Sequence, residues 1–475
     1  MRTGRYVDRW VRAGRRAPSV RARWGAACVS VGLVAAALSG SCAERESPRN
    51  ILLITLDTVR ADRLGCYGFA EDTSPFLDSV AATSVRFLHA LSPSAMTPAS
   101  HASILTGLYP YNHGLRVIYA ERGCVLSNSI PTLAGVLQSE GWSTGAFLSS
   151  FTVSEFYGFD RGFDVYDSGL LVPADRSFVL KDNGIWSWPV PANQRRADKT
   201  AEEAIRWLKE QEGPYLAWVH FWDPHDLALL PPDSVLGRFV TSEEETEDWM
   251  REVYEAEIFW VDRSIRRIFE TLEEKGDLDR TIVVIVADHG QGLGDHGWWG
   301  HRILYQEQIR VPLLLKGPGI DGGKTIDNLV RTIDLYPTLL EMLGVDPPEA
   351  VDGRSLLPIL RGRSDPPRTA YAEALNQFDL NAAVRINRPE FGLLYSTILG
   401  DWKLIHRPNS PGESELYNLA EDPDELINRY AEEPAIADSL LGILDEFGGW
   451  VAESFGSAAD QEIIDKLRSL GYVDE

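Results

Sequence analysis

The chain has 475 residues, of which 44% are hydrophobic and 14 are tryptophans, and its formal charge is −24. This length and composition favour one large and one smaller folded domain, or two medium domains, over a disordered chain. So acidic a chain is repelled by nucleic acid and by anionic lipid, and we expect no nucleic-acid partner. An anionic substrate would need cations held within its own binding site.

The N-terminus has the pattern of a targeting segment. Residues 1–24 carry eight arginines and one acid, residues 25–38 form an uncharged apolar stretch, and Ser-Gly-Ser at 39–41 precedes Cys42. The apolar stretch is short for a membrane span. We therefore expect an exported protein, periplasmic or extracellular, with residues 1–48 as leader and linker. Lipid attachment to a membrane through Cys42, simple cleavage and an uncleaved anchor remain alternatives.

Short apolar runs that alternate with helical stretches predict an α/β domain with buried strands. Four such runs are Asn50–Leu56, Tyr215–Phe221, Thr281–Ala287 and Val311–Lys316. The first three run into Asp57, Asp223 and Asp288-His289, respectively. Because ligands bind beyond the carboxyl ends of strands in open α/β sheets, we expect these side chains to meet in one region.

Helices are expected between these strands. Ile130–Glu140 is one, and a capping box that begins at Thr200 predicts the start of a second. Trp249–Lys275 has apolar residues at helical spacing and is followed by Gly276. Within this long helix Asp262 and Glu257 are expected to be solvated or in salt bridges, as most surface acids are.

The segment Arg361–Pro367 is basic and contains proline, and the sequence pattern changes after it, so we expect a domain boundary there. Beyond it, Ala370–Ala374, Tyr395–Leu399 and Trp402–His406 have the pattern of strands in a small antiparallel sheet. We therefore expect a catalytic domain at 49–365 and a smaller α+β domain at 366–475.

Histidine is scarce, yet seven of the nine histidines fall in the segments that carry these acids. They are His101, His113, His220, His225, His289, His296 and His301. Such clustering favours a metal or acid–base site over scattered structural imidazoles. Asp57, Asp288 and His289 together form a mixed oxygen and nitrogen ligand set, suited to zinc or manganese and less comfortably to calcium.

Thr97 opens the run TPASHASILTG. A threonine hydroxyl becomes a useful nucleophile when a metal ion lowers its pKa and holds it in line with an ester. The structural alternative is a helix N-cap, which a threonine before Pro98 suits well. The two roles are compatible, because a helix N-terminus also stabilises an incoming oxyanion.

These motifs, taken in order, resemble the sulfatase family of the alkaline phosphatase superfamily over residues 49–475. The resemblance rests on NILLITLDTVRADRLGCYG (50–68), the segment 97–114, VADHGQGLGDHGWWGH (286–301), RVPLLLKGPG (310–319), and GDWKLI, ELYNLAEDPDEL and LGYV in the C-terminal part. It implies a large domain with a mixed, mostly parallel sheet between helices, and a smaller domain with a four-stranded antiparallel sheet.

The resemblance also implies roles for individual residues. Asp57, Asp288 and His289 match metal ligands, and Thr97 matches the nucleophile, which touches the metal. His225, in HFWDPH, matches a substrate-contacting histidine that protonates the leaving group.

The chain departs from the family pattern at several of these positions. Most sulfatases carry Cys or Ser in a Cys/Ser-x-Pro-x-Arg motif that is oxidised to formylglycine. Thr97 cannot form that aldehyde, so no formylglycine is expected, and His101 stands in the place of the arginine, which supports the nucleophile. Thr58 replaces the second aspartate of the first metal motif. The Gly-Lys-Trp-His signature is absent near residues 144–151, and His301 replaces a lysine that often contacts sulfate.

We expect a metal-dependent hydrolase of sulfate esters that uses Thr97 and acts on a small anionic ester or a glycan-linked sulfate or phosphate. A phosphodiester or phosphonate monoester hydrolase, a phosphoryl-group transferase and a non-catalytic binding protein are the alternatives. The divalent ion would be calcium in a sulfatase-like site and manganese or zinc in a phosphodiesterase-like site. His220, Asp223 and His301 are expected to bind substrate or, with His225, a second metal ion.

Overall fold

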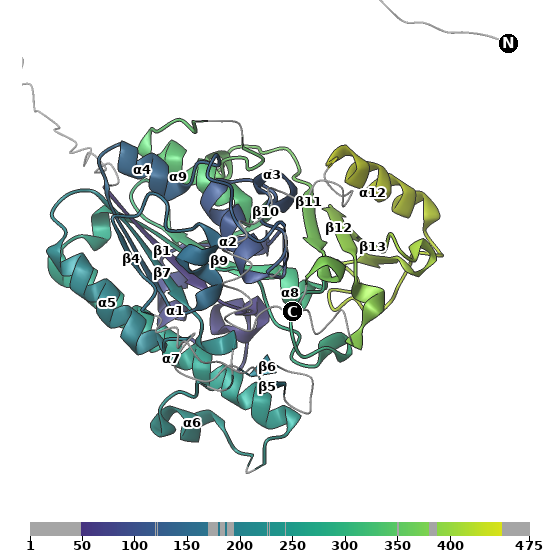
Figure 1. Ribbon diagram of the computed structural model, residues 1–475, viewed down its shortest axis with the longest axis horizontal. Coiled ribbons are helices and arrows are strands. Elements are labelled where there is room, and N and C mark those ends of the chain that lie inside the picture. Colours follow the sequence, from purple (N-terminus) through teal and green to yellow (C-terminus); the bar gives the residue numbers. More distant parts are fainter. Residues whose placement is uncertain are drawn as a thin grey trace, which may run out of the picture. The chain divides into compact units, whose positions relative to one another are not determined.

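A large sheet with helices on both sides carries most of the chain in the computed structural model (Figure 1). The structure describes residues 49–448, except 119, 121, 170–178, 181–185, 188–193, 226, 228, 243, 349–350 and 380–386. The eight strands follow one another across the sheet in the order β10 (Lys324–Arg331), β2 (Val85–Leu91), β9 (Arg310–Lys316), β8 (Thr281–Ala287), β1 (Asn50–Leu56), β7 (Tyr215–Phe221), β3 (Ser143–Leu148) and β4 (Val165–Asp167).

Within this sheet β9 runs antiparallel to both of its neighbours, and the other strands pair in parallel. Every residue of β1, β7 and β8 is buried, as expected for central parallel strands covered on both faces. The three strands are in flush register, because Leu56 lies opposite both Phe221 and Ala287. The residues that follow them therefore emerge at one edge of the sheet.

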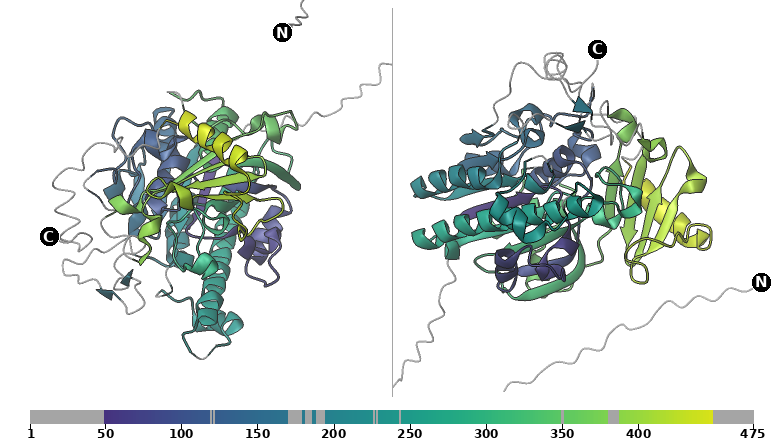
Figure 2. Two further views of the ribbon diagram at one scale, coloured as in Figure 1. Left: turned by 90° about the vertical axis from the view of Figure 1, so that its right-hand side faces the viewer. Right: turned by 90° about the horizontal axis from the view of Figure 1, so that it is seen from below.

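Helices cover the sheet in two layers, with α5 and α7 packed together on one side and α2, α4 and α9 on the other (Figures 1 and 2). The helices are α1 (Pro75–Ala81), α2 (Thr97–Thr106), α3 (Pro110–His113), α4 (Leu133–Ser139), α5 (Ala197–Glu210), α6 (Asp233–Phe239), α7 (Glu247–Lys275), α8 (Gln306–Ile309), α9 (Leu335–Leu343), α10 (Leu357–Leu360) and α12 (Pro434–Glu446).

Several predictions about helices differ from the structure. The helix expected at Ile130–Glu140 is α4, which begins at Leu133 because the Thr132 side chain caps it by accepting from the Gly135 backbone N–H. Glu257 of α7 is buried rather than solvated.

α5 begins at Ala197 rather than at Thr200, because Asp223 Oδ1 accepts a hydrogen bond from the backbone N–H of Ala197 at 3.0 Å. Asp262 is buried rather than solvated, and its carboxylate accepts from the backbone N–H groups of Phe76 and Leu77 at 3.0 and 2.7 Å. Each carboxylate satisfies the free donors at the start of a helix.

The smaller sheet is antiparallel and contains β11 (Ala370–Ala374), β12 (Leu394–Leu399), β13 (Trp402–His406) and β14 (Glu415–Asn418), in that order. Helix α12 packs on β12 and β13. A further pair of two-residue strands comprises β5 (Val179–Leu180) and β6 (Trp186–Ser187). The expected architecture, a mostly parallel sheet between helices and a separate four-stranded antiparallel sheet, is confirmed.

Several predictions fall outside the described residues: the leader 1–48 with Cys42, and the C-terminal LGYV at 470–473. The boundary near 361–367 stays a prediction. Buried apolar side chains of both sheets share a cluster, for example Leu91 of β2 with Ala372 of β11 and Ile398 of β12. None of the helices in the described part of the chain is long and apolar enough to cross a membrane.

Candidate active site

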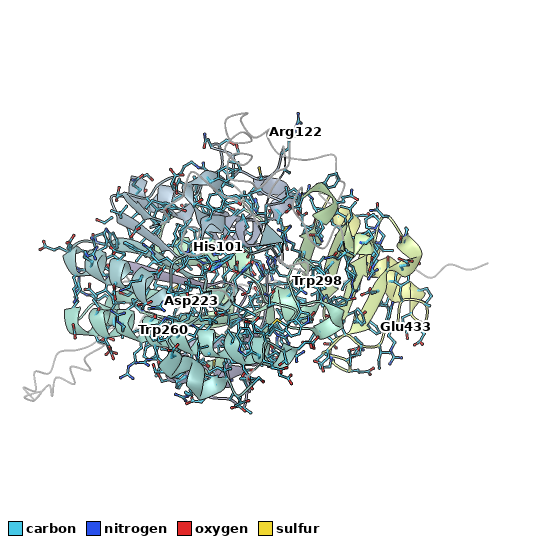
Figure 3. All side chains as sticks on the ribbon, turned by 60° about the horizontal axis from the view of Figure 1, so that its bottom comes forward. His101, Arg122, Asp223, Trp260, Trp298 and Glu433 are labelled. Carbon is cyan, nitrogen blue, oxygen red and sulfur yellow. The ribbon has the colours of Figure 1, made fainter. Side chains whose placement is uncertain are left out.

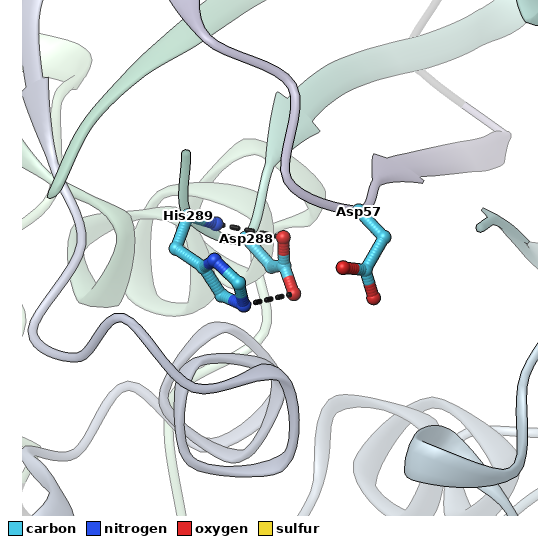
Figure 4. Close-up of side chains that lie close together, drawn as sticks. All are labelled: Asp57, Asp288 and His289. Atoms are coloured by element: carbon cyan, nitrogen blue, oxygen red, sulfur yellow. Dashed lines mark hydrogen bonds and ion pairs between the residues drawn. The ribbon is translucent and has the colours of Figure 1, made fainter. Parts of the chain in front are cut away.

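Asp57, which follows β1, lies close to Asp288 and His289, which follow β8 (Figure 4). Asp57, Asp288 and His289 each direct a ligand atom to a common point, and these atoms lie within 4.8 Å of one another. Thr97 Oγ1 is 3.2 Å from His289 Nε2. All four residues are at most 1% exposed. The predicted ligand set and the predicted nucleophile therefore form one cluster.

The two carboxylates of this cluster have oxygens that receive no hydrogen bond from any described residue: both oxygens of Asp57, and Oδ2 of Asp288. Burial raises the pKa values of Asp57 and Asp288 well above their ordinary range, and the charge of Asp288 raises that of Asp57 further. Buried carboxylates without partners are costly unless a cation joins them. The arrangement fits a divalent metal ion.

His289 is oriented as a metal-ligating imidazole. Its Nδ1 is 2.9 Å from the carbonyl oxygen of Gly290, which only accepts, so the ring carries its proton on Nδ1. Burial lowers the pKa of His289 well below its usual value and keeps the ring neutral. The Nε2 lone pair consequently faces Asp288 Oδ2, at 3.4 Å, and Thr97 Oγ1. A ligand histidine whose other nitrogen is fixed by a carbonyl is a recurrent feature of metal sites.

Thr58 helps to hold Asp288, although the expected second aspartate is missing at this position. Its backbone N–H donates to Asp288 Oδ1 at 3.1 Å, and its hydroxyl donates to the carbonyl of Asp57 at 2.8 Å. This geometry requires φ of 55°, an uncommon conformation for a β-branched residue. The Tyr254 hydroxyl fixes the same turn by donating to the Thr58 carbonyl. Strained backbone of this kind tends to occur at functional sites.

His101 and His220 lie beside the carboxylates, with their ring centroids 4.8 Å apart. His101 Nδ1 donates to the Thr97 carbonyl at 2.8 Å and is 3.6 Å from Asp288 Oδ2. Its Nε2 has no hydrogen-bond partner among the described residues. Burial lowers the pKa of His101 to about 4. His220 Nε2 is 3.5 Å from Asp57 Oδ2, so both rings border the cation position as neutral groups.

His225 and His301 form a pair next to this cluster. Their Nε2 atoms are 3.1 Å apart, and the His301 ring centroid is 4.5 Å from that of His289. His301 donates from Nδ1 to the Ala95 carbonyl at 2.8 Å, so its Nε2 accepts and His225 carries a proton on Nε2. Trp222 stacks on His225 with a centroid separation of 3.6 Å. Burial lowers the pKa values of both histidines well below the usual range.

Asp223 lies apart from these contacts. Its Oδ1 accepts from the backbone of Ala197, and its Oδ2 has no hydrogen-bond partner within the described part of the chain. Burial raises the pKa of Asp223 to about 7. Asp223 and His101, both labelled in Figure 3, are buried. The Asp223 carboxylate serves the start of α5, and its participation in substrate or metal binding stays a prediction.

Three contributors to the site were not predicted from the sequence. They are the Thr58 N–H, the Trp222 ring, and the Ser100 hydroxyl, which donates to the Asp288 carbonyl at 2.7 Å. Ser100 follows Thr97 by three positions, so it lies near the same face of α2. The spacing of Thr97 and Ser100 is the one sequence feature that indicates any of these three contributors.

Comparisons with known proteins agree with the motifs. Residues 49–345 match the family model named "Sulfatase", and residues 294–441 match the model "N-sulphoglucosamine sulphohydrolase, C-terminal". An N-acetylglucosamine-6-O-sulfatase of Bacteroides thetaiotaomicron is 25% identical, over 86% of this chain and 89% of its own. A multifunctional alkaline phosphatase superfamily protein of Trinickia caryophylli is 26% identical, over 82% of this chain and 92% of its own.

Solved structures share the fold. One, in complex with its substrate D-glucosamine-2-N,6-O-disulfate, has a TM-score of 0.70 at 21% identity and covers 86% of this chain and 99% of its own. The phosphonate monoester hydrolase of Agrobacterium radiobacter has a TM-score of 0.64 at 21% identity, over 86% of this chain and 96% of its own. With a family model that matches well over half of its length, the chain belongs to the sulfatase family of hydrolases, within the alkaline phosphatase superfamily.

Proposed function

We propose that the chain is a metal-dependent hydrolase of sulfate esters in which Thr97 is the nucleophile. The observation that carries the proposal is the position of the Thr97 hydroxyl, 3.2 Å from His289 Nε2 and beside two buried carboxylates, of which both Asp57 oxygens and Asp288 Oδ2 have no hydrogen-bond partner among the described residues. No ordinary structural role requires two buried acids, Asp57 and Asp288, to share a site with a neutral imidazole lone pair.

Asp57, Asp288 and His289 would hold the ion, with Thr97 Oγ1 adjacent to it. The bound ion supplies positive charge that lowers the pKa of the Thr97 hydroxyl and offsets the negative charge of the ester. Two carboxylates suit calcium, whereas the imidazole favours manganese or zinc. We infer a single ion, because Asp223 is engaged by α5, and His225 and His301 alone make a sparse second site.

In the proposed reaction Thr97 is the nucleophile and His225 transfers protons. Thr97 Oγ1, whose hydroxyl proton would pass to solvent once the ion is bound, forms a bond to sulfur as the bond from sulfur to the alcohol oxygen breaks, and His225 gives a proton to the departing oxygen. His225 must be an imidazolium for this step, and the incoming anion offsets the burial that otherwise lowers its pKa. Afterwards neutral His225 takes a proton from the water that attacks sulfur, the bond from sulfur to Thr97 Oγ1 breaks, and hydrogen sulfate leaves. His301 and Trp222 keep the His225 ring in place.

The second candidate is hydrolysis of a phosphodiester or a phosphonate monoester. The observation in its favour is chemical: His101 and His301 provide neutral imidazoles where sulfatases usually carry an arginine and a lysine. The chain is also similar to a phosphonate monoester hydrolase in fold and to a multifunctional superfamily member in sequence.

A glycan-linked sulfate is the substrate class that the relatives favour, since one is an N-acetylglucosamine-6-O-sulfatase and one structure holds a disulfated glucosamine. Export through the leader, with or without a lipid on Cys42, would place the enzyme where such glycans occur.

Paired assays separate the two functions. The purified mature protein is given an aryl sulfate and the matching aryl phosphodiester, each with calcium, manganese or zinc, alongside Asp288→Asn. The sulfatase proposal predicts the higher kcat/KM on the sulfate, with the variant depleted in metal and inactive. Faster turnover of the phosphodiester would overturn the sulfate assignment. If no divalent ion binds and Asp288→Asn changes nothing, both hydrolase proposals fail.

A further inference from the structure

The loop between His289 and His301 is a folded-back structure with His296 at its tip. Its backbone hydrogen bonds join Gly292 N to Gly300 O (2.8 Å), Leu293 N to Trp299 O (3.3 Å) and Gly294 N to Trp298 O (3.1 Å). The indole N–H of Trp298 donates to the His301 carbonyl at 2.9 Å. Through these bonds, the position of the tip affects the position of His301.

His296 has an acceptor opposite each of its ring nitrogens. Its Nδ1 is 3.1 Å from Glu307 Oε1, and its Nε2 is 3.2 Å from the Glu425 carbonyl oxygen. A carboxylate and a carbonyl only accept hydrogen bonds, so both contacts are made at once only when both nitrogens carry protons. The ring also stacks on Tyr305, with centroids 3.7 Å apart and planes 2° from parallel, a geometry that suits an imidazolium.

The Glu425 carbonyl lies in the loop between β14 and α12, called the C-terminal loop below, and buried contacts hold the Glu425 side chain. The Glu425 carboxylate forms an ion pair with Lys403 of β13 at 2.6 Å, and both side chains are fully buried. The same carboxylate accepts from the backbone N–H of Gln306 at 2.5 Å. His296 and Glu425, which make the contact between the two loops, both have positive φ (51° and 54°), an uncommon conformation for residues other than glycine.

We propose that His296 is a positioning residue that acts as an imidazolium, tying the tip of loop 289–301 to Glu307 and to the C-terminal loop and so holding His301 against His225. The role rests on the proposed function only in that His289 and His301 belong to the active site. Loss of one proton from His296 removes one of its two donors and frees the tip. The site is therefore ordered at lower pH and loosened at higher pH.

The direction of the pH effect follows from the surroundings of His296. Burial lowers the pKa of His296, but the Glu307 carboxylate and the Glu425 carbonyl outweigh burial and raise it overall. A raised pKa means that the stabilisation is complete below the ordinary value near 6.5 and disappears as pH rises through the value in the folded protein. The charged groups around the ring and the cavity of about 420 Å³ that it borders are Arg60, Asp62, Arg63, Asp295, Glu307, Arg310, Asp424, Glu425 and Lys403.

Hydrogen–deuterium exchange of the full chain, without substrate, tests the proposal. Asparagine tolerates positive φ and retains donors but does not titrate, so His296→Asn is the informative variant. We expect the protection factors of residues 290–302 in the wild type to fall about tenfold from pH 6 to pH 9, the effect of one charge-assisted hydrogen bond. In His296→Asn they should be low and independent of pH. His89→Asn, which alters an exposed histidine on β2, should behave as the wild type.

A second variant covers the case in which His296→Asn does not fold. Glu307→Gln keeps an acceptor but removes its charge, so the transition in protection should move to lower pH. The part of the fall in kcat/KM at alkaline pH that comes from His296 should be absent in His296→Asn and should move to lower pH in Glu307→Gln, whereas the part that comes from the His225 imidazolium should remain in both variants. Protection that is independent of pH in the wild type, or unchanged by both variants, would overturn the proposal, whereas failure of the sulfatase assay alone would not.

Discussion

The two buried carboxylates of the active site predict how the metal-free protein responds to pH. Because burial raises the pKa values of Asp57 and Asp288, and the charge of Asp288 raises that of Asp57 further, the folded protein binds more protons than the unfolded chain above the ordinary pKa of about 3.8. The free energy of unfolding must then fall as pH rises, until the pKa values of the folded state are passed. For each proton difference the slope is about 1.4 kcal/mol per pH unit.

Asp57→Asn removes one of these protons and the repulsion. Relative to the wild type in a chelator, the variant should lose a slope of about 1.4 kcal/mol per pH unit and be more stable near neutral pH, while losing activity. The informative quantity is the difference between the slopes of the wild type and Asp57→Asn. Other buried acids, such as Asp262, whose pKa burial raises to about 7, contribute equally to both slopes.

Urea unfolding at half-unit steps from pH 4.5 to pH 8, with chelator and with saturating divalent ion, provides the measurement. Asp327→Asn, at an exposed carboxylate on β10, is the matched control and should leave the slope unchanged. The ion should flatten the wild-type slope and not that of Asp57→Asn. Equal slopes in the wild type and Asp57→Asn under chelation would refute the reasoning.

Further substitutions test other parts of the account. Thr97→Ala should reduce kcat by about 10⁴-fold with unchanged metal content, while Thr97→Ser should retain most of the activity, as steady-state kinetics and elemental analysis will show. Arg116→Met leaves the fully buried Glu373 without its 2.6 Å ion-pair partner, and urea unfolding should show a loss of about 3–5 kcal/mol. Asp223→Asn should leave the metal stoichiometry unchanged and cost about 1 kcal/mol of stability at the start of α5, and a lowered stoichiometry would show that Asp223 is a ligand.

The central strands were predictable because their burial is complete. Asn50–Leu56, Tyr215–Phe221 and Thr281–Ala287 are strands β1, β7 and β8 at the predicted bounds, since a strand covered on both faces has a continuous apolar sequence. Their carboxyl ends then determine where Asp57 and Asp288 lie. The positions of Asp57 and Asp288 in the candidate site could therefore be predicted from the sequence alone.

The remaining features depend on contacts between segments far apart in the chain. The start of α5 is set by Asp223, 26 positions from Ala197, so a local capping rule could not find it. The positive φ of Thr58 is stabilised by Asp288 and Tyr254, 230 and 196 positions away. Asp223 follows a central strand, as Asp57 and Asp288 do, but its Oδ1 accepts a hydrogen bond at the start of α5, a contact that the strand pattern does not predict.

The most direct test of the central claim is a search for a covalent intermediate on Thr97. The metal-loaded protein is mixed with an aryl sulfate, quenched in acid during turnover, digested and analysed by mass spectrometry. The account predicts a sulfo group on the peptide that contains Thr97, absent in Thr97→Ala and in chelator-treated protein. Turnover by Thr97→Ala at the wild-type rate, or a modification that maps to another residue, would contradict it.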